Sequence, residues 1–133
     1  MKSEFMNRAL VLAKEAMQNG EIPVGAVIVK DGKIIGEGKN CCELENNATL
    51  HAETIAISKA SQHLNNWRLS DCTLYVSLEP CPMCMGAIFN ARISQVIFGA
   101  YNEKTGSCIS CMKVEDFPLS PKPDIIGGYM GEE

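Results

Sequence analysis

Four residues combine metal-binding and acid–base side chains at short spacings. His51 and Glu53 lie two positions apart in TLHAETIAI, and Cys81 and Cys84 lie three positions apart in LEPCPMC. Three N and S ligands with a fourth position left open are typical of a catalytic zinc site. Glu53, which is not needed as a ligand, could then accept a proton and hand it on. The four residues therefore predict metal-assisted hydrolysis, provided that the fold brings the two segments together.

The C-x-x-C pair by itself has three interpretations, namely a redox dithiol, half of a zinc site, or two buried thiols. A redox dithiol needs no His-x-Glu partner, and a structural zinc usually has four protein ligands. Cys72 lies at no obvious ligand spacing. A second C-x-x-C, Cys108 and Cys111, and the neighbouring pair Cys41 and Cys42 have no second His at ligand spacing. We predict that these four are buried or idle thiols.

The bulk composition is that of an ordinary globular protein. The 133 residues are 46% hydrophobic and 21% charged, which predicts one domain spanning residues 1–133. Charged residues interrupt the apolar positions near the N-terminus, so we expect no signal peptide, no membrane partner and a cytoplasmic protein. The net charge of −4 argues against broad nucleic-acid affinity, and no DNA partner is expected.

Hydrophobic periodicity and turn residues predict strands that alternate with helices. Such an order predicts a three-layer α/β domain with a partly parallel sheet, whose first two strands form an antiparallel hairpin around Asp31 and Gly32. Thr49 is a candidate N-cap for the second helix. The expected elements are a helix over 4–18, strands over 24–30 and 33–40, a helix over 51–63, a strand over 72–78, a helix over 82–93, a strand over 94–100 and a short apolar strand within 123–130.

Both motifs fall at predicted helix starts. Free backbone N–H groups and the positive end of the helix dipole favour thiolates there. Two helices packed on one sheet can face each other with their N-termini at the carboxyl ends of the strands, where α/β domains place their sites. The sequence therefore predicts one site at this edge.

Several segments together resemble a known family. EIPVGAVIV, IGEGKN, HAE, TLYVSLEPCPMCMGAI, ARISQVIFGA and EKTG are similar to bacterial tRNA-specific adenosine deaminases of the cytidine deaminase superfamily, over about residues 5–106. The H-x-E and P-C-x-x-C pair is the signature of zinc deaminases. The resemblance implies a three-layer α/β/α cytidine-deaminase-like fold with a mixed five-stranded sheet. It also implies a homodimer that acts on a tRNA anticodon loop, whose target base is splayed into the pocket.

The resemblance also implies roles for the four residues. One Zn2+ per chain would be held by His51, Cys81 and Cys84 together with a zinc-bound water. The resulting hydroxide would attack C6 of adenine while Glu53, the proton shuttle, protonates the neighbouring ring nitrogen. Ammonia would leave and inosine would remain.

Three further positions match substrate-contacting positions of the family. Asn40 would hydrogen-bond the base or nucleoside, and the backbone N–H of Ala52 would lie beside the attacked ring. Asn102 stands near the nucleic-acid backbone, where the family often has Asp. An amide there can still bond a ribose hydroxyl but removes a charge. From its residue type and position alone, an Asn at a strand end such as Asn40 is as readily a turn or cap residue as a substrate contact.

Other departures bear on the substrate. The usual PTAHAE is ATLHAE here, with Ala48 and Leu50, and Lys39 takes a position that is commonly aromatic. The printed sequence stops at GGYMGEE, where the family continues into a helix rich in Lys and Arg, so we expect weaker phosphate contacts. The enzymatic alternative is a deaminase of a free nucleobase or nucleoside of the guanine or cytosine type. An inactive zinc-stabilised partner subunit is a further alternative, against which the presence of Glu53 argues.

Overall fold

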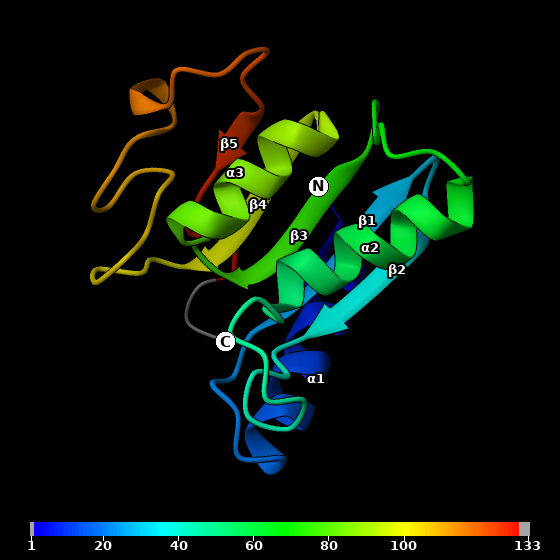
Figure 1. Ribbon diagram of the computed structural model, residues 1–133, viewed down its shortest axis with the longest axis vertical. Coiled ribbons are helices and arrows are strands. Elements are labelled where there is room, and N and C mark those ends of the chain that lie inside the picture. Colours follow the sequence, from blue (N-terminus) through cyan, green and yellow to red (C-terminus); the bar gives the residue numbers. More distant parts are fainter. Residues whose placement is uncertain (1, 131–133) are drawn as a thin grey trace.

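A mixed five-stranded sheet lies between two helical layers in the computed structural model, which describes residues 2–130 (Figure 1). The three-layer α/β/α fold and the order of the elements predicted from the sequence are confirmed. The elements are α1 (Ser3–Gln18), β1 (Gly25–Lys30), β2 (Lys33–Lys39), α2 (Ala52–Leu64), β3 (Thr73–Leu78), α3 (Pro82–Ala91), β4 (Gln95–Ala100), the 3-10 turn η1 (Val114–Asp116) and β5 (Asp124–Ile126).

The strands have the spatial order β2-β1-β3-β4-β5. β1 is antiparallel to both β2 and β3, while β3, β4 and β5 are parallel. The hairpin between β1 and β2 turns at Asp31 and Gly32, whose φ angles are 52° and 74°. Two positive φ values match the right-handed twist of the flanking strands, which is why Asp-Gly is a strong hairpin signal.

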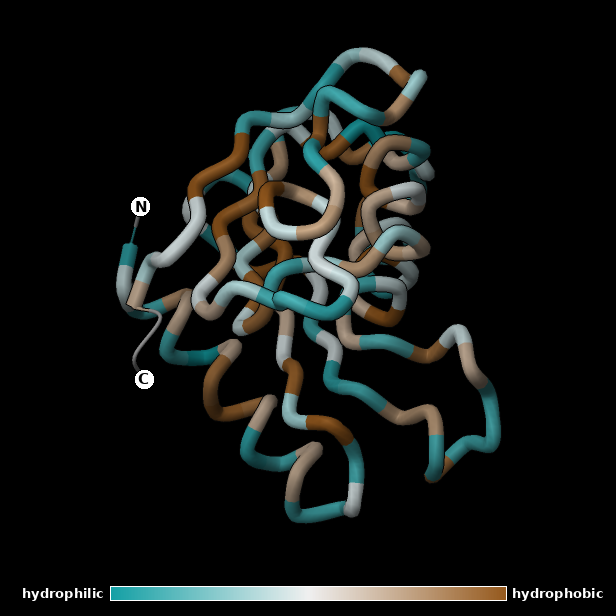
Figure 2. The backbone as a smooth tube through the Cα atoms, turned by 90° about the vertical axis from the view of Figure 1, so that its left-hand side faces the viewer, coloured by the Kyte–Doolittle hydropathy of each residue, from teal (hydrophilic) through white to brown (hydrophobic). Residues whose placement is uncertain are grey.

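Each face of the sheet has its own hydrophobic core. α2 and α3 cover one face, and α1 covers the other. Hydrophobic segments gather in the interior, whereas many of the outer turns are hydrophilic (Figure 2). The first core includes Ala56, Ala60, Leu74, Val76, Met85, Ile88, Val96 and Phe98, and the second includes Phe5, Met6, Ala9, Val27, Tyr75 and Ile97.

Two glycines of β2 set the position of α2. A Cβ atom at Gly36 would collide with the backbone of Ala56, and one at Gly38 would collide with the carbonyl of Ala52. Hydrogen in place of a side chain therefore allows the first turns of α2 to lie directly on the strand. This close contact fixes the end of α2 that carries His51 and Glu53.

The predicted N-cap of α2 is wrong. α2 begins at Ala52 with His51 as its N-cap, and the His51 side chain makes no cap hydrogen bond. The Thr49 hydroxyl donates instead to Asn47 Oδ1 at 2.7 Å, which also accepts the Thr49 backbone N–H at 2.9 Å. Asn side chains readily form such local turns, and this turn places Thr49 two residues before the N-cap position.

The chain's last segment, GGYMGEE, is described only as far as Met130, and residues 131–133 lie outside the described residues. Within residues 2–130, no helix combines the length and the apolar character needed to cross a membrane.

Candidate active site

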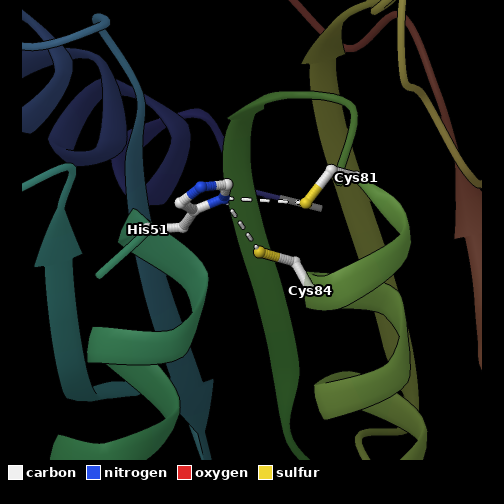
Figure 3. A group of neighbouring side chains, drawn as sticks. All are labelled: His51, Cys81 and Cys84. Atoms are coloured by element: carbon white, nitrogen blue, oxygen red, sulfur yellow. Dashed lines mark hydrogen bonds between the residues drawn. The ribbon is translucent and has the colours of Figure 1, made fainter. Parts of the chain in front are cut away.

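The N-termini of α2 and α3 place the two motifs together, as the sequence predicted. His51 is the N-cap of α2 and Cys81 is the N-cap of α3, and neither side chain makes a cap hydrogen bond. Glu53 and Cys84 follow within the first turns of the two helices. The cap side chains are therefore free to point at each other across the gap between the helices (Figure 3).

The spacing of His51, Cys81 and Cys84 fits a tetrahedral zinc ion. His51 Nδ1 lies 3.6 Å from Cys81 Sγ and 3.5 Å from Cys84 Sγ. Tetrahedral zinc with usual Zn–N and Zn–S bonds separates its nitrogen and sulfur ligands by about 3.6 Å. Within residues 2–130, no other group of three or more His, Cys, Asp or Glu side chains lies close enough together to hold a metal ion. Three protein donors leave one position of the tetrahedron open.

The two thiols of this group differ in acidity. The hydrogen bond from the Cys84 thiol lowers the pKa of Cys81 to about 5, and the neighbouring His51 contributes to that decrease. The same hydrogen bond, followed by burial, raises the pKa of Cys84 above its ordinary value. Cys81 is therefore a thiolate at neutral pH even without a metal, which is the form that binds metal ions.

Glu53 is a buried carboxyl beside these ligands. It is 4% exposed, and it borders the same cavity as His51 and Cys81. Burial raises the pKa of Glu53 to about 7, and the nearby charge of Cys81 adds to the increase. A carboxyl with a pKa near neutrality can both accept and return a proton at physiological pH.

The cavity that contains these residues has a volume of about 400 Å³. That volume lies within the range of typical small-molecule sites. Exposed Ile22 lies at its border, which indicates that the cavity opens to solvent. The residues around it include Glu21, Ile22, Val24, Asn40, Cys42, Glu43, His51, Glu53, Leu78, Glu79, Cys81, Asn102 and Thr105.

Asn40 and Ala52, two predicted substrate contacts, are bonded to each other. The Ala52 backbone N–H donates to Asn40 Oδ1 at 2.7 Å, so this N–H is already used by the protein. Because a backbone N–H can only donate, the bond fixes which end of the Asn40 amide is oxygen. Within residues 2–130, Asn40 Nδ2 has no hydrogen-bond partner, and Asn40 borders the cavity. Asn40 therefore offers an N–H donor to a bound molecule.

Asn102, the third predicted contact, borders the cavity but is occupied by its own turn. Its Oδ1 accepts the backbone N–H groups of Lys104 and Thr105, each at 3.2 Å. Its Nδ2 donates to the Thr105 hydroxyl at 2.9 Å. The amide thus shapes the cavity wall, and one Nδ2 hydrogen is left for a ligand.

Lys39 and Leu50, two other departures from the family pattern, are not among the residues that border the cavity. Lys39 forms an ion pair with Glu15 of α1, with 2.9 Å between Nζ and Oε1. Leu50 borders a separate groove beside α2, together with Met83.

Cys108 is buried and Cys111 is exposed, and neither belongs to the metal-binding group described above.

Sequence reasoning missed two buried carboxylates of the cavity, Glu21 and Glu79. Glu21 accepts the backbone N–H groups of Glu43 at 3.1 Å and Leu44 at 2.7 Å. Glu79, at the end of β3, is 1% exposed and accepts several hydrogen bonds from a distant loop. A charged residue directly after a strand of buried residues, as in TLYVSLEP, is a signal that could have identified Glu79.

A family model of MafB19-like deaminases matches residues 1–129. The chain belongs to this deaminase family. It shares 53% identity over 110 residues with a tRNA-specific adenosine deaminase of Streptococcus pyogenes, which is 83% of the chain and 69% of the relative. The chain spans 64% of the length of other S. pyogenes proteins with that name.

Two solved structures show how this deaminase chain relates to enzymes with different substrates. One, from a study of A-to-I editing by tRNA:A34 deaminases, has a TM-score of 0.95 and 38% identity, covering 98% of this chain and 96% of that chain. The other, guanine deaminase from Bacillus subtilis, has a TM-score of 0.73 and 49% identity, covering 76% of this chain and 65% of that chain. Both matches support the cytidine-deaminase-like fold.

Proposed function

We propose that this deaminase is a zinc-dependent hydrolase that converts adenosine to inosine in a tRNA anticodon loop. The observation that carries the chemistry is that His51, Cys81 and Cys84 have the spacing of zinc ligands while Glu53 lies in the same cavity. The relatives named as tRNA adenosine deaminases support the substrate.

His51, Cys81 and Cys84 would hold one zinc ion per chain, leaving one position for water. When bound, zinc acts as a Lewis acid that lowers the pKa of a water molecule to near neutrality. Glu53 would accept a proton from the water and deliver it to N1 of adenine. It would transfer the second proton to the amine at C6, which leaves as ammonia. The water oxygen stays on C6, so the product is inosine.

Asn40 would orient the base or its ribose. Its Nδ2 donor is held toward the cavity because its Oδ1 accepts the Ala52 N–H. Asn102, which also borders the cavity, would contribute its remaining Nδ2 hydrogen. The Ala52 N–H itself acts through Asn40, so we assign it a positioning role.

The extent of the structural similarity favours a tRNA substrate over a free base. The structure from the tRNA:A34 deaminase study matches almost the whole of both chains, whereas guanine deaminase matches about three quarters of this chain. A deaminase of guanine, cytosine or a nucleoside is the alternative. The 49% identity to guanine deaminase is the observation that favours it.

We also propose that the chain is one domain, is cytoplasmic and assembles as a homodimer. A groove of about 450 Å³ beside α2 is lined by Leu50, Ile55 and Met83 together with the polar residues Thr49, Thr54, Ser58, Lys59 and Gln62. Leu50 directly precedes His51, and Met83 lies between Cys81 and Cys84 in the chain. A second copy seated in this groove would therefore contact residues next to the metal ligands. A tRNA substrate supports the cytoplasmic assignment.

The experiment that tests the proposed chemistry compares the unaltered chain with Glu53→Ala. We expect inosine formation in an anticodon stem-loop to fall at least about 100-fold, since acid–base groups contribute that much or more. Both proteins should contain one zinc per chain by metal analysis. Glu37→Gln, which alters a surface carboxylate paired with Arg8, is the matched control and should be fully active. Activity that survives in the zinc-loaded Glu53→Ala protein would disprove the role of Glu53.

A further inference from the structure

Glu79 is the most heavily hydrogen-bonded carboxylate in the described part of the chain. Its Oε2 accepts three successive backbone N–H groups, from Cys108 at 3.0 Å, Ile109 at 2.7 Å and Ser110 at 2.9 Å. Its Oε1 accepts the Ser110 hydroxyl at 2.5 Å and the Asn102 N–H at 3.2 Å. One side chain after β3 thus holds both ends of the segment 102–110, which we call the wall loop.

The wall loop has few other attachments. Residues 101–113 contain no helix or strand, and Glu103, Lys104 and Thr105 are exposed. Besides the Glu79 bonds, the Ser107 N–H donates to the carbonyl of Pro80 at 2.8 Å. The Cys108 side chain is buried beside Met85. Most of the hydrogen bonds that join the wall loop to the strands and helices before it in the chain therefore end on Glu79.

Close packing confirms that the loop is built around this carboxylate. A Cβ atom at Gly106 would collide with the carboxyl group of Glu79 and with the carbonyl of Asn102. Gly106 therefore allows the loop backbone to pass directly over Glu79, and the loop residues Asn102 and Thr105 border the cavity as a result.

Glu79 borders the same cavity as Glu53, but its chemistry is different. The oxygens of Glu79 accept hydrogen bonds from Asn102 and from residues 108–110 of the wall loop. Both oxygens are occupied by donors of the loop, so Glu79 remains a carboxylate with no free position for a substrate proton. Acid–base chemistry is left to Glu53.

We propose that Glu79 is a positioning residue that sets substrate affinity by holding the wall loop, and with it Asn102 and Thr105, against the cavity. This inference rests on the proposed deaminase function for its kinetic consequence. The groups assigned to chemistry lie at the N-terminal ends of α2 and α3 and not on the loop. Releasing the loop should therefore weaken substrate binding more than it slows the chemical step.

The kinetic test is Glu79→Gln, which places an amide N–H2 among backbone N–H donors. We expect KM for the anticodon stem-loop to rise at least about tenfold, because a hydrogen bond to a charged group is worth about that factor. We expect kcat to stay within about threefold, with one zinc per chain retained. Glu37→Gln, remote from the cavity, should change neither constant. An unchanged KM, or kcat that falls as much as KM rises, would overturn the proposal.

A second variant covers the case in which Glu79→Gln does not fold. Ser110→Ala removes only the hydroxyl that donates to Glu79 Oε1, so we expect the same KM effect at roughly threefold or more. A normal KM in Ser110→Ala would contradict the anchoring role if Glu79→Gln is unfolded.

Amide hydrogen exchange separates this proposal from the proposed function. In Ser110→Ala and Glu79→Gln, the amides of residues 108–110 should exchange at least about tenfold faster, while those of α2 are unchanged. This result needs no substrate. If the unaltered chain deaminates no substrate, the proposed function is wrong, but faster exchange in the two variants still supports the role of Glu79 in holding the wall loop. If the exchange of these amides is unchanged, that role is refuted whatever the activity.

Discussion

The two cysteines of the metal site are not equivalent. Cys81 is half-buried and has a pKa lowered to about 5, whereas Cys84 is fully buried with a raised pKa. That both lie close to His51 could be predicted from the sequence, because the C-x-x-C and H-x-E motifs each fall at a predicted helix start. Their unequal acidity could not be predicted, because it depends first on the hydrogen bond between the two sulfurs and then on how deeply each is buried.

Removing the buried sulfur should remove the metal. We expect Cys84→Ser to carry less than about one tenth of a zinc ion per chain, because a serine hydroxyl does not supply the thiolate that zinc binds. Cys72→Ser is the matched control, since Cys72 is equally buried but lies outside the metal-binding group. Metal analysis after dialysis measures both. A full zinc content in Cys84→Ser would show that the ligand set is different.

The orientation of the Asn40 amide also could not be predicted from the sequence, because it depends on a contact between two elements. The sequence predicts an Asn at the end of a strand, which is as readily a turn residue as a ligand contact. Only the hydrogen bond between the Ala52 N–H and Asn40 Oδ1, made across the gap between β2 and α2, shows which end of the amide faces the cavity.

At the scale of elements, the helices and strands could be predicted because their signals are local. Apolar periodicity, Asp31-Gly32 and the Gly after α1 each act within a few residues of the structure they specify. The wall loop could not be predicted, because its donors lie 23 to 31 positions from Glu79 in the chain. The predicted N-cap of α2 was wrong because Thr49 lies in a turn with Asn47 and the N-cap position falls two residues later.

The groove beside α2 carries the prediction that belongs to this scale. Ser58 is exposed and lines the groove, so the larger side chain of Ser58→Arg should prevent a second copy from docking there. We expect this variant to be a monomer of 14.5 kDa and the unaltered chain to have twice that mass. Ser70→Arg, at an exposed position away from this groove, is the control and should remain dimeric. Sedimentation equilibrium gives both masses. A Ser58→Arg dimer would place the interface elsewhere.

At the scale of the whole molecule, the substrate depends on which base fits the cavity and on whether the surface around the cavity can bind the phosphates of an RNA. The proposed chemistry removes the amino group of an amino-substituted ring, which adenine, guanine and cytosine all provide. Four carboxylates border the cavity, Glu21, Glu43, Glu53 and Glu79, and no Lys or Arg is among the residues found there. A neutral base suits this lining, and phosphates would lie outside it.

Measuring kcat/KM on a panel of substrates tests the central claim most directly. The panel holds a tRNA anticodon stem-loop with adenosine at its wobble position, free adenosine, guanine, guanosine and cytosine, each assayed with the zinc-loaded chain by ammonia release. The account predicts inosine in the stem-loop with kcat/KM at least about 100-fold above that for any free base or nucleoside. Turnover of guanine or cytosine with no inosine in the stem-loop would contradict it.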